Sequence, residues 1–165
     1  MCIRDRTFNL LEGLKLNLFG AYTYNIVENS QYLPTSVWAN GQAYKGTKKR
    51  ESLLGNMMLT YKKNWKKHFF DVLALAELQK ETYTGYYTTV SNFSTDKFGY
   101  NNLQAGALRL WEGTNSYYDQ PRLASFMGRF NYTYADRYVL TLNARTDASS
   151  KFGANHKWGF FPSAS

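Results

Sequence analysis

The sequence predicts an all-β fold, an antiparallel meander of long strands. Three observations favour it. Apolar and polar residues alternate along five stretches, short and long connections alternate between those stretches, and aromatic residues make up 18% of the 165 residues. A period of two is typical of a strand whose two faces meet different surroundings. Aromatic residues are themselves favoured in strands.

The alternation is clearest from Gly13 to Ile26, where apolar or small residues occupy the even positions and Lys15 and Asn17 stand between them. The same period recurs over residues 53–63, 70–80, 124–134 and 138–147. Another apolar run begins at Trp158. About six strands are therefore expected.

The connections between these strands differ in length in a regular way. Residues 63–68 and 135–137 leave room only for tight turns, whereas residues 27–52 and 81–122 are long. Long loops without structure are uncommon in compact soluble domains. Outer-membrane barrels, in contrast, have short periplasmic turns and long outer loops. The alternation of lengths favours the barrel.

The Ala135-Asp136-Arg137 connection permits a prediction of strand register. If these residues form a three-residue hairpin loop, apolar residues face apolar ones and polar residues face polar ones along the ladder. A slip by one residue would mix the two sets, so the pattern specifies the register. The predicted pairs are Tyr134–Tyr138, Tyr132–Leu140, Phe130–Leu142, Asn131–Thr141 and Arg129–Asn143.

Alternation alone fits both a soluble sandwich and a membrane barrel, and the mean hydropathy of −0.52 fits both as well. No apolar stretch reaches the ~18 residues of a membrane helix. Strands of roughly 10 to 14 residues exceed the usual globular length of about 5 to 6 and suit a tilted spanning strand. Aromatic residues at strand ends favour a membrane interface, although Tyr is also a good strand former. These residues are Tyr22, Tyr24, Trp65, Tyr132, Tyr134 and Tyr138.

The net charge of +8 permits an anionic partner. Its basic clusters, Lys45–Arg50 and Lys62–Lys67, fall at opposite ends of one predicted strand. That separation argues against the continuous stripe that nucleic acid needs. We expect the first cluster near the outer rim, either as a solvated loop or in contact with lipopolysaccharide phosphates.

The residue types that carry catalysis and metal binding are isolated. His68 and His156 have no ligand partner at a metal-like spacing, and Asp147 with Ser149 and Ser150 reads as a turn. Cys2 is the only cysteine, and no phosphate-binding glycine motif occurs. We expect no enzyme activity, no cofactor and no metal, and the sequence singles out no substrate-binding residue.

Residues 125–165, SFMGRFNYTYADRYVLTLNARTDASSKFGANHKWGFFPSAS, carry a dense motif. It resembles the barrel signature of the SusC/RagA family of TonB-linked outer-membrane proteins, in which a GR-N-Y-Y-DRY hairpin is followed by R-D-SS-FG and W-G-FPS. The matching residues are Gly128, Arg129, Asn131, Tyr132, Tyr134, Asp136, Arg137, Tyr138, Arg145, Asp147, Ser149, Ser150, Phe152, Gly153, Trp158, Gly159, Phe161, Pro162 and Ser163.

The resemblance implies an open, curved segment of a transmembrane barrel of about 22 strands in the bacterial outer membrane. It also implies import of glycans or other large nutrients, a SusD-like surface lipoprotein as partner, and coupling to TonB through a plug region that this sequence does not contain. We expect residues 1–6 to be a non-native leader and residues 7–165 to be a partial barrel truncated at both ends.

On this interpretation one face of the strands lines a hydrated lumen. Its candidate residues are Lys15, Asn17, Asn56, Arg129, Asn143 and Arg145. We expect the Tyr- and Asn-rich segment 82–102 to contribute to the substrate mouth. The alternatives are a secreted soluble β-sandwich that binds carbohydrate and, less favoured, a basic nucleic-acid-binding β protein.

Overall fold

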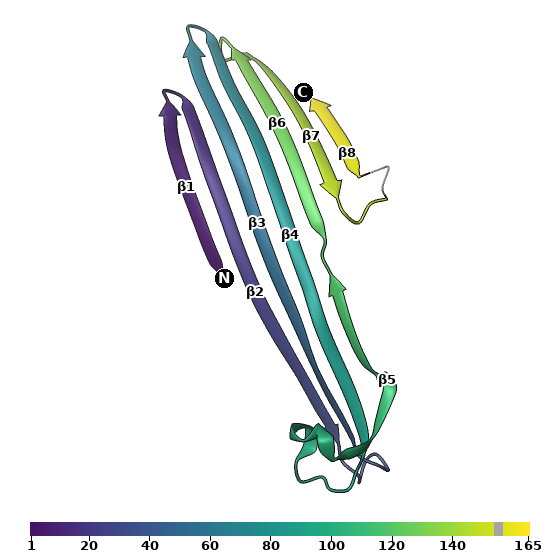
Figure 1. The fold of residues 1–165 in the computed structure, drawn as a ribbon. Coiled ribbons are helices and arrows are strands. Elements are labelled where there is room, and N and C mark those ends of the chain that lie inside the picture. The colour runs from purple at the N-terminus through teal and green to yellow at the C-terminus, as the bar shows by residue number, and fades with distance from the viewer. Residues whose placement is uncertain (154–156) are drawn as a thin grey trace. The chain divides into compact units, whose positions relative to one another are not determined.

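The computed structural model describes residues 1–153 and 157–165. In these residues eight strands form one sheet with the order β1-β2-β3-β4-β6-β7-β8, and β5 pairs with the C-terminal part of β4 (Figure 1). The bounds are β1 Cys2–Leu11, β2 Leu14–Leu33, β3 Gln42–Trp65, β4 His68–Phe93, β5 Gly106–Asp119, β6 Arg122–Tyr134, β7 Tyr138–Ser149 and β8 Trp158–Ala164. The all-β, antiparallel and open fold predicted from the sequence is confirmed.

Helical structure is confined to two short 3₁₀ turns, Gly99–Asn101 and Leu103–Ala105, in the described residues. None of the helices there has the length and apolarity that crossing a membrane would require. The described strands belong to a single sheet, with no second sheet of the kind that a β-sandwich needs.

The chain divides into two compact units. The first comprises residues 1–23, 52–81 and 121–165, and the second comprises residues 24–51 and 82–120. Strands β2, β3 and β4 contribute residues to both.

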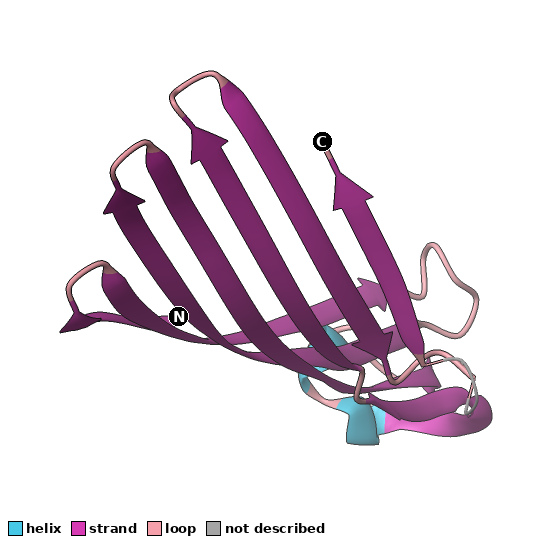
Figure 2. Ribbon diagram, turned by 90° about the horizontal axis from the view of Figure 1, so that it is seen from above, coloured by secondary structure: helices cyan, strands magenta, loops and turns pink. Residues whose placement is uncertain are grey.

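Tight turns close the hairpins of the first unit (Figure 2). Gly13 joins β1 to β2 with a φ of +79°, and a Cβ at this position would overlap the carbonyl oxygen of Lys62, so the turn requires glycine. Ala135 and Asp136 both have positive φ, and Arg137 donates its backbone N–H to the carbonyl of Tyr134 at 3.1 Å. The Ala-Asp-Arg connection is therefore the three-residue hairpin loop that the sequence predicts.

The register of this hairpin agrees with prediction at every pair. Tyr134 lies opposite Tyr138, and the ladder continues without a slip to Leu123 opposite Ser149. The same face alternation passes to β4, where Phe70 faces Tyr132, and to the end of β8, where Ala164 faces Leu142 and Ser163 faces Asn143. Phe161 is an exception, because it faces Arg145 on the polar side. The four strands thus share one apolar face and one polar face.

The expectation of about six strands is wrong by two, because β1 and β5 were not recognised. Residues 2–6, assigned to a leader, pair with β2 from Cys2 opposite Tyr22 to Arg6 opposite Leu18. The run Arg4-Asp5-Arg6 is charged at consecutive positions, which hides the alternation, whereas backbone hydrogen bonds to β2 do not depend on side chains. That residues 1–6 are non-native stays a prediction.

The long connections are also mostly strand rather than loop. Strands β2 and β3 leave only residues 34–41 between them, and residues 81–122 contain the end of β4 and all of β5. Thr and Tyr dominate the added part of β4, residues 82–93, and both are good strand formers. Pairing with β5 supplies the backbone partners that an edge extension would lack.

The second unit has a small core of its own. Ala43, Val90 and Phe93 are buried, and Tyr32 packs against them with its ring edge-on to Phe93 at 5.5 Å. The backbone N–H of Phe93 donates to the carbonyl of Asn40 at 2.9 Å. These contacts tie the 34–41 connection to the end of β4.

Candidate functional site

A line of polar side chains crosses β6, β7 and β8 on one face of the first unit. Arg129 donates from Nε to Oδ1 of Asn143 at 2.8 Å, and Asn143 donates from Nδ2 to Oγ of Ser163 at 3.2 Å. All three residues lie directly opposite one another in the ladder. The line brings together two of the predicted lumen residues, Arg129 and Asn143.

Arg145 lies two residues beyond Asn143 on the same face, where its Nε is 2.8 Å from Asp147. Asp147 faces Ser125 across the ladder and accepts a hydrogen bond from it. Arg145, a predicted lumen residue, therefore has a carboxylate partner on its own strand. Paired charges of this kind belong in water or in a hydrated pore rather than in lipid.

The other lumen candidates lie in β2 and β3. Asn17 donates from Nδ2 to Asp5 at 2.9 Å and to Thr7 at 3.0 Å, and Lys15 precedes it by one alternation. Asn56 is half-buried in β3 and shares its parity with Lys62, whose Nζ lies 3.3 Å from Asp71. Among the described residues, these side chains form no hydrogen bond or ion pair with Arg129 or Asn143, so the polar face is a lining rather than one closed pocket.

The opposite face is apolar, and aromatic rings gather at its hairpin end. Phe70 packs against Tyr132 with centroids 5.2 Å apart, and His68 lies 5.0 Å from the ring of Tyr134. Nδ1 of His68 is 2.7 Å from the hydroxyl of Tyr132. His68 is thus part of an aromatic group at the turn, and His156 lies outside the described residues.

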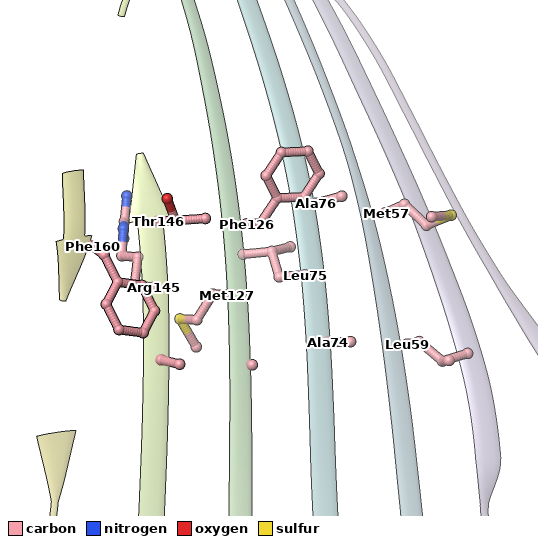
Figure 3. Close-up of a pocket in the computed structure, with 12 residues that line it drawn as sticks. Met57, Leu59, Ala74, Leu75, Ala76, Phe126, Met127, Arg145, Thr146 and Phe160 are labelled. Carbon is pink, nitrogen blue, oxygen red and sulfur yellow. The ribbon is translucent and has the colours of Figure 1, made fainter. Parts of the chain in front are cut away.

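Figure 3 shows a shallow hollow of about 390 Å³ on this apolar face. Its floor is made by the small residues Ala74 and Ala76 of β4, and Phe126 and Phe160 stand beside it. Arg145 and Thr146 also line it, and no acidic side chain does so in the described part of the chain. Such a surface is suited to contact with hydrocarbon and offers no group for acid–base chemistry.

In the second unit, Asp96 ties two connections together. Its carboxylate accepts hydrogen bonds from the hydroxyl of Tyr32 at 2.6 Å, from Oγ1 of Thr35 at 2.8 Å and from the backbone N–H of Thr35 at 3.1 Å. The hydrogen bond to Asp96, followed by burial, raises the pKa of Tyr32 to about 12. Hydrogen bonds from Tyr32 and then Thr35 lower the pKa of Asp96. Sequence reasoning missed this cluster, because its members are 61 to 64 residues apart.

The segment 82–102, predicted to contribute to a substrate mouth, belongs to this second unit. Its first part is strand rather than loop, and over residues 82–93 only Tyr86 and Asn92 are exposed, whereas Val90, Ser91 and Phe93 are buried. Tyr86 and Phe98 are exposed, as is Trp111 of β5, which is 93% exposed. Exposed rings of this kind are typical of binding surfaces.

The basic cluster Lys45–Arg50 lies in β3 and not in a loop as predicted. Lys49 forms an ion pair with Glu51 at 2.7 Å and lies 5.1 Å from the ring centre of Tyr24, and Arg50 lies over the ring of Tyr83 at 5.5 Å. Two of its cations therefore already have partners within the chain.

Long antiparallel strands with one continuous apolar face and one continuous polar face are the construction of a membrane β-barrel wall. The first unit has this construction: its apolar face presents Phe130, Leu140 and Leu142, and its polar face presents Arg129 and Asn143. The fold and the two faces thus define the class as an open segment of a transmembrane barrel.

Comparisons with known proteins point to the same class of protein. No family model matches the chain. TonB-dependent receptor P3 of Formosa agariphila is 30% identical over 160 residues, which cover 94% of this chain and 16% of the receptor. TonB-dependent receptor SusC of Bacteroides thetaiotaomicron is 29% identical over 166 residues, which cover 96% of this chain and 16% of that receptor.

Among solved structures, the RagAB peptide transporter superposes with a TM-score of 0.84 at 21% identity, covering 96% of this chain and 18% of the matched chain. Its open-open state gives a TM-score of 0.83. At this identity the likeness concerns the fold. In sequence the chain is similar to TonB-dependent receptors, SusC among them, and the resemblance found in the sequence is confirmed. It spans about a sixth of the length of the curated relatives.

Proposed function

We propose that this chain forms part of the barrel wall of a TonB-dependent importer in the bacterial outer membrane. It would act by lining a passage and not by making or breaking bonds. The observation that carries the proposal is the separation of faces across β6, β7 and β8. A hydrogen-bonded line of Arg129, Asn143 and Ser163 lies behind an apolar face of Phe130, Leu142 and Ala164.

This separation has a direct physical reason in a barrel. An arginine at the bilayer centre is costly when it faces lipid, by about 2 to 4 kcal/mol in barrels. Placing Arg129 on the lumen side, with Asn143 as its acceptor, avoids that cost. The wall would belong to a barrel of about 22 strands. The similar proteins are named as receptors and as a transporter, which is consistent with this proposal.

We further propose that the cargo is a large nutrient such as a glycan or a peptide. One matched structure is that of a peptide transporter, and glycan import is what the sequence resemblance implies. A SusD-like surface lipoprotein as lid and TonB as energy partner are proposed on the same grounds. The exposed rings of Tyr86, Phe98 and Trp111 are the surface of this chain best suited to contact cargo or lid.

Cysteine labelling tests which face is wet. In the full-length receptor with Cys2→Ser, Asn143→Cys and Leu142→Cys place a thiol at neighbouring positions on opposite faces. In intact outer membranes, a charged maleimide reagent should label Asn143→Cys at least tenfold faster than Leu142→Cys. Faster labelling of Leu142→Cys would reverse the faces and end the proposal.

Uptake tests the transport step. A strain that lacks the gene should lose growth on either an oligosaccharide mixture or an oligopeptide mixture as sole nutrient, and a strain that lacks TonB should show the same loss. Normal growth of the deletion strain on both mixtures would count against import of these two classes. Growth that needs the receptor but not TonB would remove the energy coupling.

A further inference from the structure

A groove of about 760 Å³ opens on the apolar face of the first unit, beside the middle of β4, the start of β6 and the end of β7. Small residues make its floor, and large apolar side chains stand exposed beside it: Leu78 is 62% exposed and Trp158 is 58% exposed. Its floor residues are Gly20, Gly55, Ala124 and Ala148.

Three cations line the same groove, Lys80, Arg122 and Lys157, and no carboxylate stands among its lining residues in the described part of the chain. Lys80 lies directly opposite Arg122 in the ladder, which brings two positive charges to one edge of the groove. Lys157 also lines the groove, and its backbone carbonyl accepts a hydrogen bond from the N–H of Ser149. The groove is therefore apolar along its length and positive at one end.

The position of the cations matches a membrane surface. Lys80 follows the hairpin end of β4 at His68 by about twelve residues, which is about 40 Å of strand. At a tilt of about 40° this corresponds to roughly 30 Å of height, the thickness of the hydrocarbon core. With the short turns on the periplasmic side, as the proposed function requires, the cations reach the outer headgroup region.

Toward the membrane interior, the groove continues into the hollow of Figure 3. Ala124 and Phe126 are successive residues of the apolar face of β6, and the first lines the groove while the second lines the hollow. From Arg122 to Gly128, the last residue of β6 that lines the hollow, the strand covers about 20 Å. At the same tilt of about 40° this corresponds to roughly 15 Å of height, the thickness of one hydrocarbon leaflet.

We propose that this groove binds a phosphorylated, acylated lipid of the lipid A type in the outer leaflet. Acyl chains lie over Gly55, Ala124 and Ala148, and the sugar phosphates contact Lys80 and Lys157. Phosphate is favoured over a zwitterionic headgroup because the lining carries positive charge only. The inference rests on the proposed membrane orientation and adds a specific lipid site to it.

The test measures retention of lipid A by the full-length receptor. The purified receptor, in mild detergent, is titrated with bisphosphorylated lipid A and, separately, with the dephosphorylated lipid, and bound lipid is counted by native mass spectrometry. The receptor should bind the phosphorylated form at least tenfold more tightly. Equal binding of the two forms would overturn the role of the cations.

The variants locate the site. Lys80→Ser with Lys157→Ser should weaken binding by about 25-fold, from about fivefold for each lysine near an anionic lipid surface. The matched control is Lys45→Ser with Lys48→Ser, two exposed lysines of β3 in the second unit, and it should leave binding unchanged. If the control lowers binding and the groove variant does not, the lipid binds at the basic cluster and the proposal is wrong.

A second variant tests the groove floor without changing charge. Ala124→Leu fills the floor and should weaken binding of both lipid forms by about the same factor. Unchanged binding by this variant would show that acyl chains do not lie there. If the groove variants leave lipid binding unchanged while Asn143→Cys still labels faster than Leu142→Cys, only the lipid site is rejected. If the labelling ratio is reversed, the proposed function itself is rejected.

Discussion

Phe93 holds together the core of the second unit, so its truncation tests how that unit is built. The side chain is 7% exposed, packs with Ala43 and Val90, and meets the ring of Tyr32 edge-on. Phe-to-Ala changes in well-packed cores cost about 3 to 5 kcal/mol. We expect about 3 kcal/mol for Phe93→Ala, the lower end, because only three residues of this core are buried.

Amide hydrogen exchange in the full-length receptor measures this loss locally. The N–H of Asn92 donates to the carbonyl of Gly41 at 3.2 Å, and the N–H of Phe93 donates to that of Asn40, so both report on opening of the 34–41 connection. A loss of about 3 kcal/mol accelerates their exchange by about 100-fold. Amides of β6 and β7 in the first unit should keep their rates.

Phe98→Ala is the matched control, since Phe98 is 48% exposed and lies outside this core. It should change the exchange of the same amides by less than about threefold. Unchanged exchange of residues 92 and 93 in Phe93→Ala would show that Phe93 does not hold the 34–41 connection in place. Equal acceleration of these two amides by Phe98→Ala would show the same.

The remaining predictions also concern the second unit. Hydrogen bonds from Tyr32 and Thr35 hold the pKa of Asp96 below its usual value. Asp96 therefore stabilises the cluster at pH values above its unfolded pKa, and this contribution is lost as the pH falls through its folded pKa. The pKa of Tyr32 is raised to about 12, so the contribution of Tyr32 is complete below its unfolded pKa and is lost as pH rises through about 12. Exchange rates of residues 34–41 followed against pH should rise at both extremes, and Asp96→Asn should remove the acid limb. Gly85→Ala should loosen the β4–β5 pair, because the new Cβ would lie 2.6 Å from the ring of Tyr117. Tyr117→Ala in the same chain should restore resistance to proteolysis between β4 and β5, and no rescue would show that the clash is not the cause.

The hairpin of β6 and β7 shows why sequence alone predicted part of this fold so well. Apolar and polar residues alternate there without interruption around a tight turn, and a slip of one residue would place Phe130 opposite a polar partner. Local pattern and turn chemistry therefore specify the same register. The polar line from Arg129 to Asn143 follows directly from that register.

Strands β1 and β5 show where such reasoning fails. The run Arg4-Asp5-Arg6 breaks the alternation, yet the edge of β2 offers backbone partners that accept any side chain. β5 pairs with an extension of β4 whose length no local pattern indicates, including Gly85 opposite Tyr117. Pairing between distant segments decided both strands.

By itself, the sequence determined the class of fold, the two faces of the strands and the hairpin register, because each depends on a period of two over neighbouring residues. Only the tertiary structure decided how far the strands continue, that Asp96 joins Tyr32 and Thr35, and that Lys80 and Arg122 meet at one end of an apolar groove. These features join residues tens of positions apart. Their distances depend on the pairing of whole strands, which no local pattern encodes.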